Sequence, residues 1–276
     1  ENIAKAAEKE KKNFAGTEIS GKKLGVIGLG AIGIKVANMA LHLGMEVYGC
    51  DPYLSVQSAW QLSRNVKLVN SNDEIFARCD YISLHVPMTP NTKNMIDATA
   101  LNQMKEGVTI LNYARGGLVD EDAMLEAMNN GKVKNYVSDF ASPKMMKHEN
   151  YICTPHLGAS TPEAEDNCAI MAAKQLKDFL EKGNIVNSVN FPKTVTDNPI
   201  PVGGTRLCIS HKNIPDTISK FTTIIGESKL NISSFLNQAR GDVAYNIIDV
   251  DGKVTDEIIE KLKACDTVNR VRAIFA

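Results

Sequence analysis

Short apolar runs alternate with amphipathic stretches between Lys23 and Cys153. The apolar runs have the length of strands and read, in order, KLGVIGLG, EVYGC, YISLHV, VTILN, NYVSDF and NYICT. Between them lie helix-like stretches such as GAIGIKVANMALHLG and DEDAMLEAMNNGK. Near-continuous apolar strands that alternate with helices are typical of a parallel sheet covered on both faces. The pattern therefore predicts an α/β fold built on a doubly wound parallel sheet.

A long helix is predicted after these strands. Thr161 can cap it, Pro162 suits its first turn, and Gly183 can end it. Glutamates in the first turn also suit the positive end of a helix. The apolar face expected for this helix is formed by Met171, Leu176, Phe179 and Leu180.

The pattern changes in the last part of the chain. Residues 191–204, FPKTVTDNPIPVGG, are rich in proline, glycine and polar residues and are typical of a linker. Beyond them RLCISH, NISSFLNQ, VAYNIIDV and VNRVRAIF are strand-like, whereas PDTISKFTTIIGESK and TDEIIEKLKAC are helical. This βαββαβ order predicts a small ferredoxin-like domain.

The first predicted strand ends in a glycine motif. Gly28, Gly30 and Gly33 form a G-x-G-x-x-G pattern that opens a helix, and the next strand ends at Asp51. Such glycines permit a tight turn, a close approach of pyrophosphate and helix–strand packing. Asp51 is placed to accept hydrogen bonds from a ribose and would repel a 2′-phosphate. The motif predicts a Rossmann-type site for NAD rather than NADP; the alternative is a turn whose glycines serve packing alone.

Composition and charge narrow the class of protein. The chain is 43% hydrophobic with a formal net charge of -1, so its charge does not indicate a nucleic-acid or anionic-membrane partner. No apolar run approaches the ~20 residues of a membrane span, and the polar start ENIAKAAEKEKKNF lacks the core of a secretion signal. The cysteines are scattered without zinc-like spacing. These features favour a cytoplasmic protein with buried, reduced thiols and no metal site.

Five motifs, in this order, resemble those of the NAD-dependent D-2-hydroxyacid dehydrogenases: VIGLGAIG, CDPY, SLHVPMTPNTKNMI, LNYARGGLVDEDAM and TPHLGAST. The tail resembles the ACT domain that some of these enzymes carry, and the resemblance implies a homo-oligomer that uses NAD. The parts predicted are a segment leading in from a substrate lobe (1–20), the NAD-binding Rossmann domain (21–160), a long helix returning to that lobe (161–190), the linker (191–204) and an ACT-like regulatory domain (205–276).

The resemblance assigns roles to polar residues that follow predicted strands. Arg115 matches the arginine that grips the substrate carboxylate and polarises the reacting carbonyl, a task that suits a planar guanidinium. His156 matches the acid–base histidine, and Asp139 matches the residue that contacts the nicotinamide carboxamide. Without these motifs, Arg115 would be read as a surface ion pair and His156 as a structural histidine. The residues expected at the cofactor are Gly28, Gly30, Ala31, Ile32, Gly33, Asp51, His85, Val86, Pro87, Thr92, Ala114, Arg115, Asp139, His156 and Gly158.

The chain departs from the family pattern beside His156. The family has a glutamate shortly after the Asp139 position to hydrogen-bond the histidine, whereas this chain has Ser142 and Lys144 there. The nearest alternative acid is Glu149, which falls in the turn before the next strand. Without a carboxylate the imidazolium would lose its stabilising partner, so His156 should be a competent base but a weaker acid. Lys144 or Lys147 could instead meet a phosphate or carboxylate of the substrate, or both could be solvated on a surface loop.

A second departure lies at the start of the chain. Family members begin with about one more half-domain, which supplies most of the substrate lobe. We therefore expect these 276 residues alone to bind NAD but to oxidise substrate poorly. The expected substrate is a small phosphorylated 2-hydroxy acid. The alternatives are another acid, such as glycerate, hydroxypyruvate or 2-oxoglutarate, and a non-catalytic NAD-sensing module.

The ACT-like tail indicates a regulatory ligand. Positions similar to His211, Asn213 and Asn231 bind L-serine between two ACT domains in serine-regulated relatives. Asparagine amides and the backbone at a helix start can supply the donors and acceptors that an amino acid needs. Asp216 stands where the family usually has glycine, and its charge would oppose a serine carboxylate. The tail is therefore predicted either to bind L-serine or to serve dimerisation alone.

Overall fold

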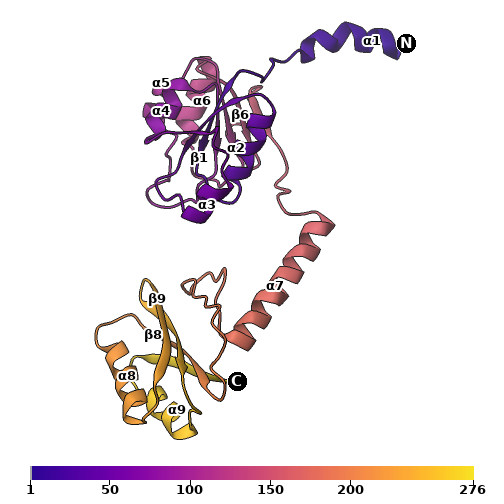
Figure 1. Cartoon of the computed structure of the whole chain (residues 1–276). Coiled ribbons are helices and arrows are strands. Elements are labelled where there is room, and N and C mark those ends of the chain that lie inside the picture. The colour runs from indigo at the N-terminus through magenta and orange to yellow at the C-terminus, as the bar shows by residue number, and fades with distance from the viewer. Residues whose placement is uncertain (1) are drawn as a thin grey trace. The chain divides into compact units, whose positions relative to one another are not determined.

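The computed structural model describes residues 2–276, except for the side chains of Lys12 and Phe14. These residues form two compact units, one ending at Leu157 and the other beginning at Gly158. Each unit contains a sheet of its own (Figure 1). Each unit therefore buries its own hydrophobic core.

A seven-stranded parallel sheet forms the centre of the first unit, with the strand order β3-β2-β1-β4-β5-β6-β7. The doubly wound α/β fold predicted from the apolar runs is confirmed. Strand β3 was not predicted, because it has only two residues and both are exposed. The strands are β1 (Lys23–Ile27), β2 (Glu46–Cys50), β3 (Lys67–Leu68), β4 (Tyr81–Leu84), β5 (Val108–Asn112), β6 (Val133–Ser138) and β7 (Tyr151–Cys153).

Helices cover both faces of this sheet (Figure 1). Leu24 and Val26 of β1 pack with Ile34 of α2. Ile82 and Ile110 pack on the other face with α4, α5 and α6, since successive strand residues point to opposite faces. The helices are α1 (Ile3–Glu10), the 3-10 helix η1 (Lys11–Phe14), α2 (Gly33–His42), α3 (Val56–Gln61), α4 (Asn72–Arg78), α5 (Ala98–Gln103) and α6 (Glu121–Asn129).

A four-stranded antiparallel sheet forms the second unit, with the order β11-β8-β10-β9. The predicted βαββαβ order is confirmed. Helices α8 and α9 cover one face, where Leu207 and Phe221 are fully buried. The opposite face carries Tyr245 and packs against Phe179 of helix α7 and Phe191. The elements are α7 (Pro162–Lys182), β8 (Thr205–Lys212), α8 (Thr217–Glu227), β9 (Ile232–Arg240), β10 (Val243–Val250), α9 (Asp256–Lys263) and β11 (Val268–Phe275).

Helix α7 begins and ends where the sequence predicts. The Thr161 hydroxyl accepts a hydrogen bond from the Ala164 amide at 3.2 Å, and Gly183 takes a left-handed conformation that stops the helix. No residue of the helix is fully buried. Of its predicted apolar face, Phe179 packs on the sheet, whereas Leu176 and Leu180 remain more than half exposed.

A buried ion pair fastens the start of the second sheet to neighbouring chain segments. Arg206 and Asp249 are almost fully buried and meet through two hydrogen bonds of 2.7 and 2.8 Å. Arg206 also donates to the carbonyl oxygens of Lys182 and Asn198, so its charge is neutralised and its donors are engaged. Thr194 is buried too, so part of the predicted linker is built into this unit.

The cysteines are unpaired and differ in exposure. Cys50, Cys79 and Cys208 are buried, as predicted, whereas Cys168 is exposed on α7 and the prediction is wrong there. Burial raises the pKa of the Cys79 thiol to about 12, so this group is protonated and unreactive at neutral pH. Among residues 2–276, no helix has both the length and the apolar character that a membrane crossing requires.

Candidate active site

The predicted site residues lie along one edge of the parallel sheet. The strand order reverses between β1 and β4, and ligands of open α/β sheets bind in the crevice at such a switch point. The loops after β1, β2, β4, β5, β6 and β7 carry the residues assigned to cofactor and substrate. Because parallel strands end on the same side, these loops share the carboxyl-end edge of the sheet.

The glycine loop after β1 packs against the loop after β4. Gly28 has a φ of +93°, and a Cβ there would lie 2.5 Å from the carbonyl oxygen of His85. A Cβ on Gly33 would lie 1.9 Å from the Gly28 carbonyl oxygen, which no side chain can tolerate. A Cβ on Gly30, by contrast, would have no heavy atom within 4 Å. The backbone at Gly30 therefore faces open space beside the start of α2, where a pyrophosphate has room to approach.

Asp51 joins the loops after β1 and β2. Its Oδ2 accepts a hydrogen bond from the Leu29 amide at 2.8 Å, and its Oδ1 accepts one from the Tyr53 amide at 2.8 Å. A carboxylate has about four acceptor positions, so lone pairs remain for the hydroxyls of a ribose. The same negative charge would repel a ribose 2′-phosphate.

We expect Asp51→Asn to weaken NAD binding by about 10- to 100-fold and to narrow the preference for NAD over NADP, because a charged acceptor is lost. Fluorescence titrations with NADH and NADPH measure both affinities. Asp73→Asn, at an exposed acid of α4, is the matched control and should leave both affinities unchanged. An unaltered ratio of NADH to NADPH affinity in Asp51→Asn would contradict the role of the charge.

The loop after β4 contributes a neutral histidine to the site. His85 lies 2.8 Å from the Ser83 hydroxyl through Nε2, and burial lowers the pKa of its ring to about 4. His85 is therefore neutral at physiological pH. Thr92 donates a hydrogen bond of 2.6 Å to the carbonyl oxygen of Pro87, which closes the loop that also contains Val86. The contacts predicted between this loop and the adenosine half of NAD stay predictions. Ala31, Ile32 and Gly158 are exposed, and their predicted contacts with the cofactor stay predictions too.

Arg115 follows β5 with its guanidinium exposed. The Asn112 amide donates to the Arg115 carbonyl oxygen at 3.0 Å and fixes the turn, while Nη1 of Arg115 donates to the Ala114 carbonyl oxygen at 2.8 Å. Among the described residues no carboxylate lies within ion-pair distance of Arg115. The alternative of a surface ion pair therefore has no support, and the remaining donors are free for a carboxylate ligand.

His156 has a carboxylate partner, which corrects the expectation that it lacks one. Its Nδ1 lies 3.0 Å from Oδ2 of Asp139, whose side chain is only 8% exposed, whereas the histidine side chain is 55% exposed. The family pattern places the acid at Ser142 or Lys144, whereas the acid that reaches the imidazole, Asp139, comes directly after β6. The expectation that His156 is a weaker acid for want of a carboxylate therefore loses its basis.

The second carboxylate oxygen of Asp139 accepts no hydrogen bond from the part of the chain that the structure describes. Oδ1 is buried and has no hydrogen-bond partner among the described residues, a costly state for a carboxylate oxygen. The amide group of a nicotinamide carboxamide is a donor of the kind that this oxygen lacks. The orphaned oxygen, the open space at Gly30 and the free acceptors of Asp51 together fit NAD.

The two lysines near His156 differ in their surroundings. Lys144 forms an ion pair of 2.5 Å with Asp122 at the start of α6, and this hydrogen bond raises the pKa of the ammonium. Lys147 is exposed and forms no ion pair with the residues described. Ser142 is buried, with its backbone amide donating to the Tyr151 hydroxyl at 3.2 Å. The pairing of Lys144 favours a solvated surface lysine over a group that replaces the acid.

We expect Lys144→Ala to change kcat/KM by less than about twofold, because exposed ion pairs contribute little. The measurement is the rate of NADH formation by the full gene product. Lys147→Ala is the companion variant: a loss of activity there alone would assign a substrate contact to Lys147. A loss in Lys144→Ala would instead contradict a purely surface role for that residue.

The side chains of the three residues predicted to bind L-serine all have hydrogen-bond partners within the protein. His211 is 2% exposed, its Nδ1 lies 2.8 Å from the Lys212 carbonyl oxygen, and its ring packs edge-on against Phe221. Its assignment to serine is therefore corrected, because the ring belongs to the core. The Asn213 amide donates to the Gly241 carbonyl oxygen and the Asn231 amide donates to Asp251, so both are engaged.

Phe140 and Asn112 shape the site without having been predicted. The Phe140 ring lies 5.0 Å from the His156 ring, and a Cβ added to Gly116 would lie 3.7 Å from the Phe140 ring, so Phe140 lies near the loops after β5 and β7. Asn112 is 1% exposed at the end of an apolar strand, and a polar residue in such a place is a signal that could have identified it. Phe140 carries no such signal, because an aromatic residue after a strand is ordinary core.

The family is shown by comparison with known proteins. Residues 1–158 match the sequence model of the D-isomer specific 2-hydroxyacid dehydrogenase NAD binding domain. The chain belongs to the D-isomer specific 2-hydroxyacid dehydrogenases, and its first unit is an NAD-binding domain of that family.

Particular relatives and structures are similar to this chain. The D-3-phosphoglycerate dehydrogenase of Haemophilus influenzae is 35% identical over 270 residues, which cover 94% of this chain but only 64% of that protein. A glyoxylate reductase from Paecilomyes thermophila is 30% identical with a TM-score of 0.59, covering 67% of this chain and 57% of that one. The NAD-complexed D-isomer specific 2-hydroxyacid dehydrogenase of Lactobacillus delbrueckii ssp. bulgaricus is 25% identical with a TM-score of 0.57, covering 64% and 59%.

Proposed function

We propose that this chain carries the NAD-binding domain and the acid–base group of an enzyme that oxidises a small 2-hydroxy acid. The observation that carries the proposal is the pair formed by His156 and Asp139, with Nδ1 3.0 Å from Oδ2. The pair lies at the carboxyl-end edge of the sheet, and the Phe140 ring lies 5.0 Å from the His156 ring. A Cβ added to Gly116, next to Arg115, would lie 3.7 Å from Phe140. A histidine held by a buried carboxylate is suited to accept and return a proton.

The orientation of the imidazole assigns the reacting nitrogen. With its proton on Nδ1, neutral His156 donates to Asp139 and leaves the lone pair of Nε2 free. In oxidation, Nε2 takes the proton of the C2 hydroxyl while the hydrogen on C2 leaves as hydride, and Asp139 stabilises the resulting imidazolium. Arg115 holds the substrate carboxylate through two parallel hydrogen bonds. NAD, when bound, supplies the hydride acceptor.

The substrate we propose is 3-phospho-D-glycerate, which would be oxidised to 3-phosphohydroxypyruvate at the first step of L-serine biosynthesis. Support comes from the similarity of nearly the whole chain to a protein named D-3-phosphoglycerate dehydrogenase. The exposed cationic side chains of Arg115 and Lys147 suit an anionic substrate. Glycerate, hydroxypyruvate and 2-oxoglutarate are the competing acids on the same machinery.

Steady-state rates across a panel of acids test this proposal. NADH formation by the full gene product is measured with 3-phospho-D-glycerate, D-glycerate and D-2-hydroxyglutarate, and NADH consumption with hydroxypyruvate and 2-oxoglutarate. Among the oxidations, the highest kcat/KM is expected for 3-phospho-D-glycerate. A higher value for the oxidation of an unphosphorylated acid would assign that acid as the substrate, and NAD binding without turnover of any acid would favour the NAD-sensing module.

The proposed role of the second unit is regulatory. An ACT-like domain, a homo-oligomeric state and a cytoplasmic location are consistent with the proposed enzyme. Because His211 is buried, an L-serine effector would have to bind through the side-chain amides of Asn213 and Asn231. Both amides would first have to release their present hydrogen-bond partners. Calorimetry with L-serine tests the effector: no heat at millimolar L-serine would remove it.

A further inference from the structure

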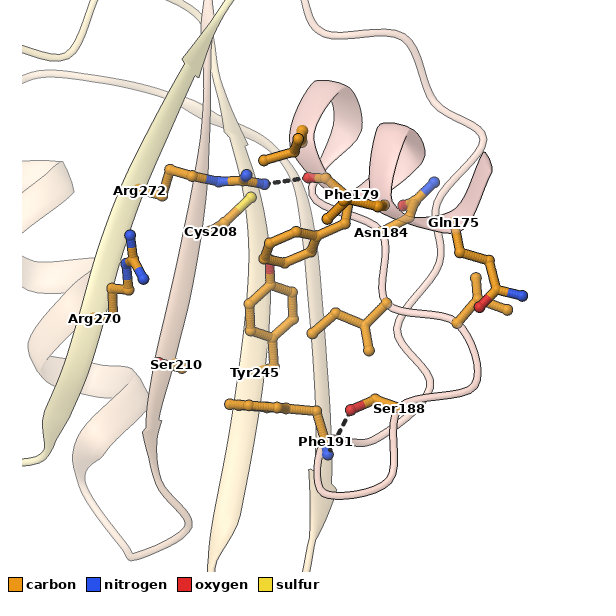
Figure 2. Close-up of a pocket in the computed structure, with 14 residues that line it drawn as sticks. Gln175, Phe179, Asn184, Ser188, Phe191, Cys208, Ser210, Tyr245, Arg270 and Arg272 are labelled. Atoms are coloured by element: carbon orange, nitrogen blue, oxygen red, sulfur yellow. Dashed lines mark hydrogen bonds between the residues drawn. The ribbon is translucent and has the colours of Figure 1, made fainter. Parts of the chain in front are cut away.

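A cavity of about 650 Å³ lies within the second unit (Figure 2). One side is formed by the second half of α7 and the segment from Asn184 to Phe191, and the other by the uncovered face of the antiparallel sheet. Its volume falls within the ~300–1,000 Å³ that small-molecule sites occupy. The cavity is separate from the sheet edge that carries His156, since all of its lining belongs to residues 175–272.

The walls of the cavity are mainly apolar. Phe179 of α7 and Phe191 lie beside Tyr245 of β10 (Figure 2). Leu176 and Ile185 also line the cavity. The rings of Phe191 and Tyr245 lie 6.2 Å apart in an edge-on arrangement. Aromatic walls of this kind favour a ligand with an aryl or alkyl body.

One end of the cavity is positively charged. Arg270 and Arg272 lie on the same face of β11, and Arg270 is in register with Ser210 of β8 (Figure 2). Among the described residues, no aspartate or glutamate lines the cavity. Within the described residues, neither arginine forms an ion pair, whereas Arg206 on the same sheet is neutralised by Asp249. The lining thus has two cationic groups and no carboxylate to balance them.

Arg272 is held in place by Phe179, but not all of its N–H donors have an acceptor. It donates to the Phe179 carbonyl oxygen through Nη2, and its guanidinium carbon lies 4.3 Å from the centre of the Phe179 ring. Its Nε is buried and has no hydrogen-bond partner among the described residues. A buried donor of a charged group without an acceptor is unfavourable, so a ligand oxygen would relieve it.

We propose that this cavity binds an amphipathic carboxylate, with its aryl or alkyl body between α7 and the sheet and its carboxylate at Arg270 and Arg272. The absence of any acidic side chain in the lining argues against an amino acid, because an ammonium group would meet only two guanidinium ions. This site is therefore distinct in chemistry from the proposed L-serine site. It does not rest on the proposed oxidation, because none of its residues belongs to the catalytic edge.

Calorimetric titration of the 276-residue chain tests the proposal. The probes are 3-phenylpropionate and octanoate, which carry an aryl and an alkyl body, with uncharged 3-phenyl-1-propanol and zwitterionic L-phenylalanine for comparison. Because Arg115 can also bind a carboxylate, heat is assigned to the cavity only where Leu176→Glu weakens it. We expect saturable binding of one or both anions. The anion that binds more tightly shows whether the cavity prefers an aryl or an alkyl body. The alcohol and the amino acid should bind at least about tenfold more weakly.

Two variants on α7 locate the site. Leu176→Glu places a carboxylate on the cavity wall and should weaken the anion at least about tenfold. Met171→Glu is the matched control on the same helix, outside the lining, and should leave affinity unchanged. Both side chains are more than 50% exposed, so both variants should fold. Arg270→Gln, at another exposed residue, should also weaken the anions.

Several outcomes would overturn the proposal. They are the absence of saturable heat for both anions, equal affinity for the alcohol, and equal effects of Leu176→Glu and Met171→Glu. Light scattering is recorded alongside. A chain that is dimeric, binds neither anion and becomes monomeric in Leu176→Glu would show that the cavity receives a second copy instead.

Discussion

Replacement of His156 by glutamine is expected to lower kcat/KM for the 2-hydroxy acid by about 10²- to 10⁴-fold, the range associated with loss of a general acid–base group. Glutamine keeps an amide that can donate to Asp139, but it cannot accept the proton of the C2 hydroxyl at neutral pH. The measurement is NADH formation by the full gene product. Affinity for NAD, titrated separately, should change by less than about threefold, so that the loss appears in the chemical step.

Asp139→Asn is the companion to this variant because it keeps the shape of the side chain and removes its charge. The Asp139 carboxylate lies 3.0 Å from the imidazole, and loss of a hydrogen bond to a charged group corresponds to about 10- to 100-fold in rate. The loss should appear in kcat/KM while the affinity for NADH, titrated by fluorescence, changes by less than about threefold. An unchanged kcat/KM would mean that Asp139 only supports the loop.

The second large effect is expected at the glycine loop. Gly33→Ala places a Cβ 1.9 Å from a backbone carbonyl oxygen of Gly28, so the first turn of α2 must move away from β1. We expect the free energy of unfolding to fall by about 3 kcal/mol, the upper end of the usual cost of overpacking, and NAD binding to fall at least about 100-fold. Thermal unfolding and a fluorescence titration with NADH measure the two effects.

Gly30→Ala distinguishes the role of this loop in cofactor binding from its role in the stability of the fold. A Cβ at Gly30 meets no heavy atom within 4 Å, so stability should be unchanged while the methyl group obstructs the pyrophosphate. The expected result is at least about tenfold weaker NADH binding at an unaltered melting temperature. If Gly30→Ala binds NADH normally, the pyrophosphate does not pass where the motif places it. If Gly33→Ala is as stable as the parent chain, the packing argument fails.

Most elements of the fold could be predicted because they are local in the sequence. The apolar runs of β1 and β4 are strand-length and nearly continuous, as buried parallel strands must be. Helix α7 carries its start and stop signals in Thr161 and Gly183. Strand β3 was missed since its exposed Lys67 and Leu68 are held only by pairing with β2, which is not local information.

Individual side chains in the tail could not be predicted in the same way. His211 and Asn213 are close in sequence and both polar, so both suited a ligand site. Their positions differ because β8 turns His211 inward, where it meets Phe221, while Asn213 lies in the turn beyond the strand. Which side chains of a strand are buried depends on the partner layers that cover each face.

The sequence by itself determined the fold class, the glycine loop for NAD and the family, because strand and helix periodicity and an ordered set of motifs are written along the chain. Only the tertiary structure decided which acid serves His156. Asp139 and His156 are separated along the chain by the bend that contains Lys144, and adjacent parallel strands β6 and β7 bring them together. Tertiary structure also decided that Oδ1 of Asp139 lacks a hydrogen-bond donor and that Arg270 and Arg272 lack a carboxylate partner. Whether a polar group has a partner depends on every neighbour that packs around it, and the sequence does not give those neighbours.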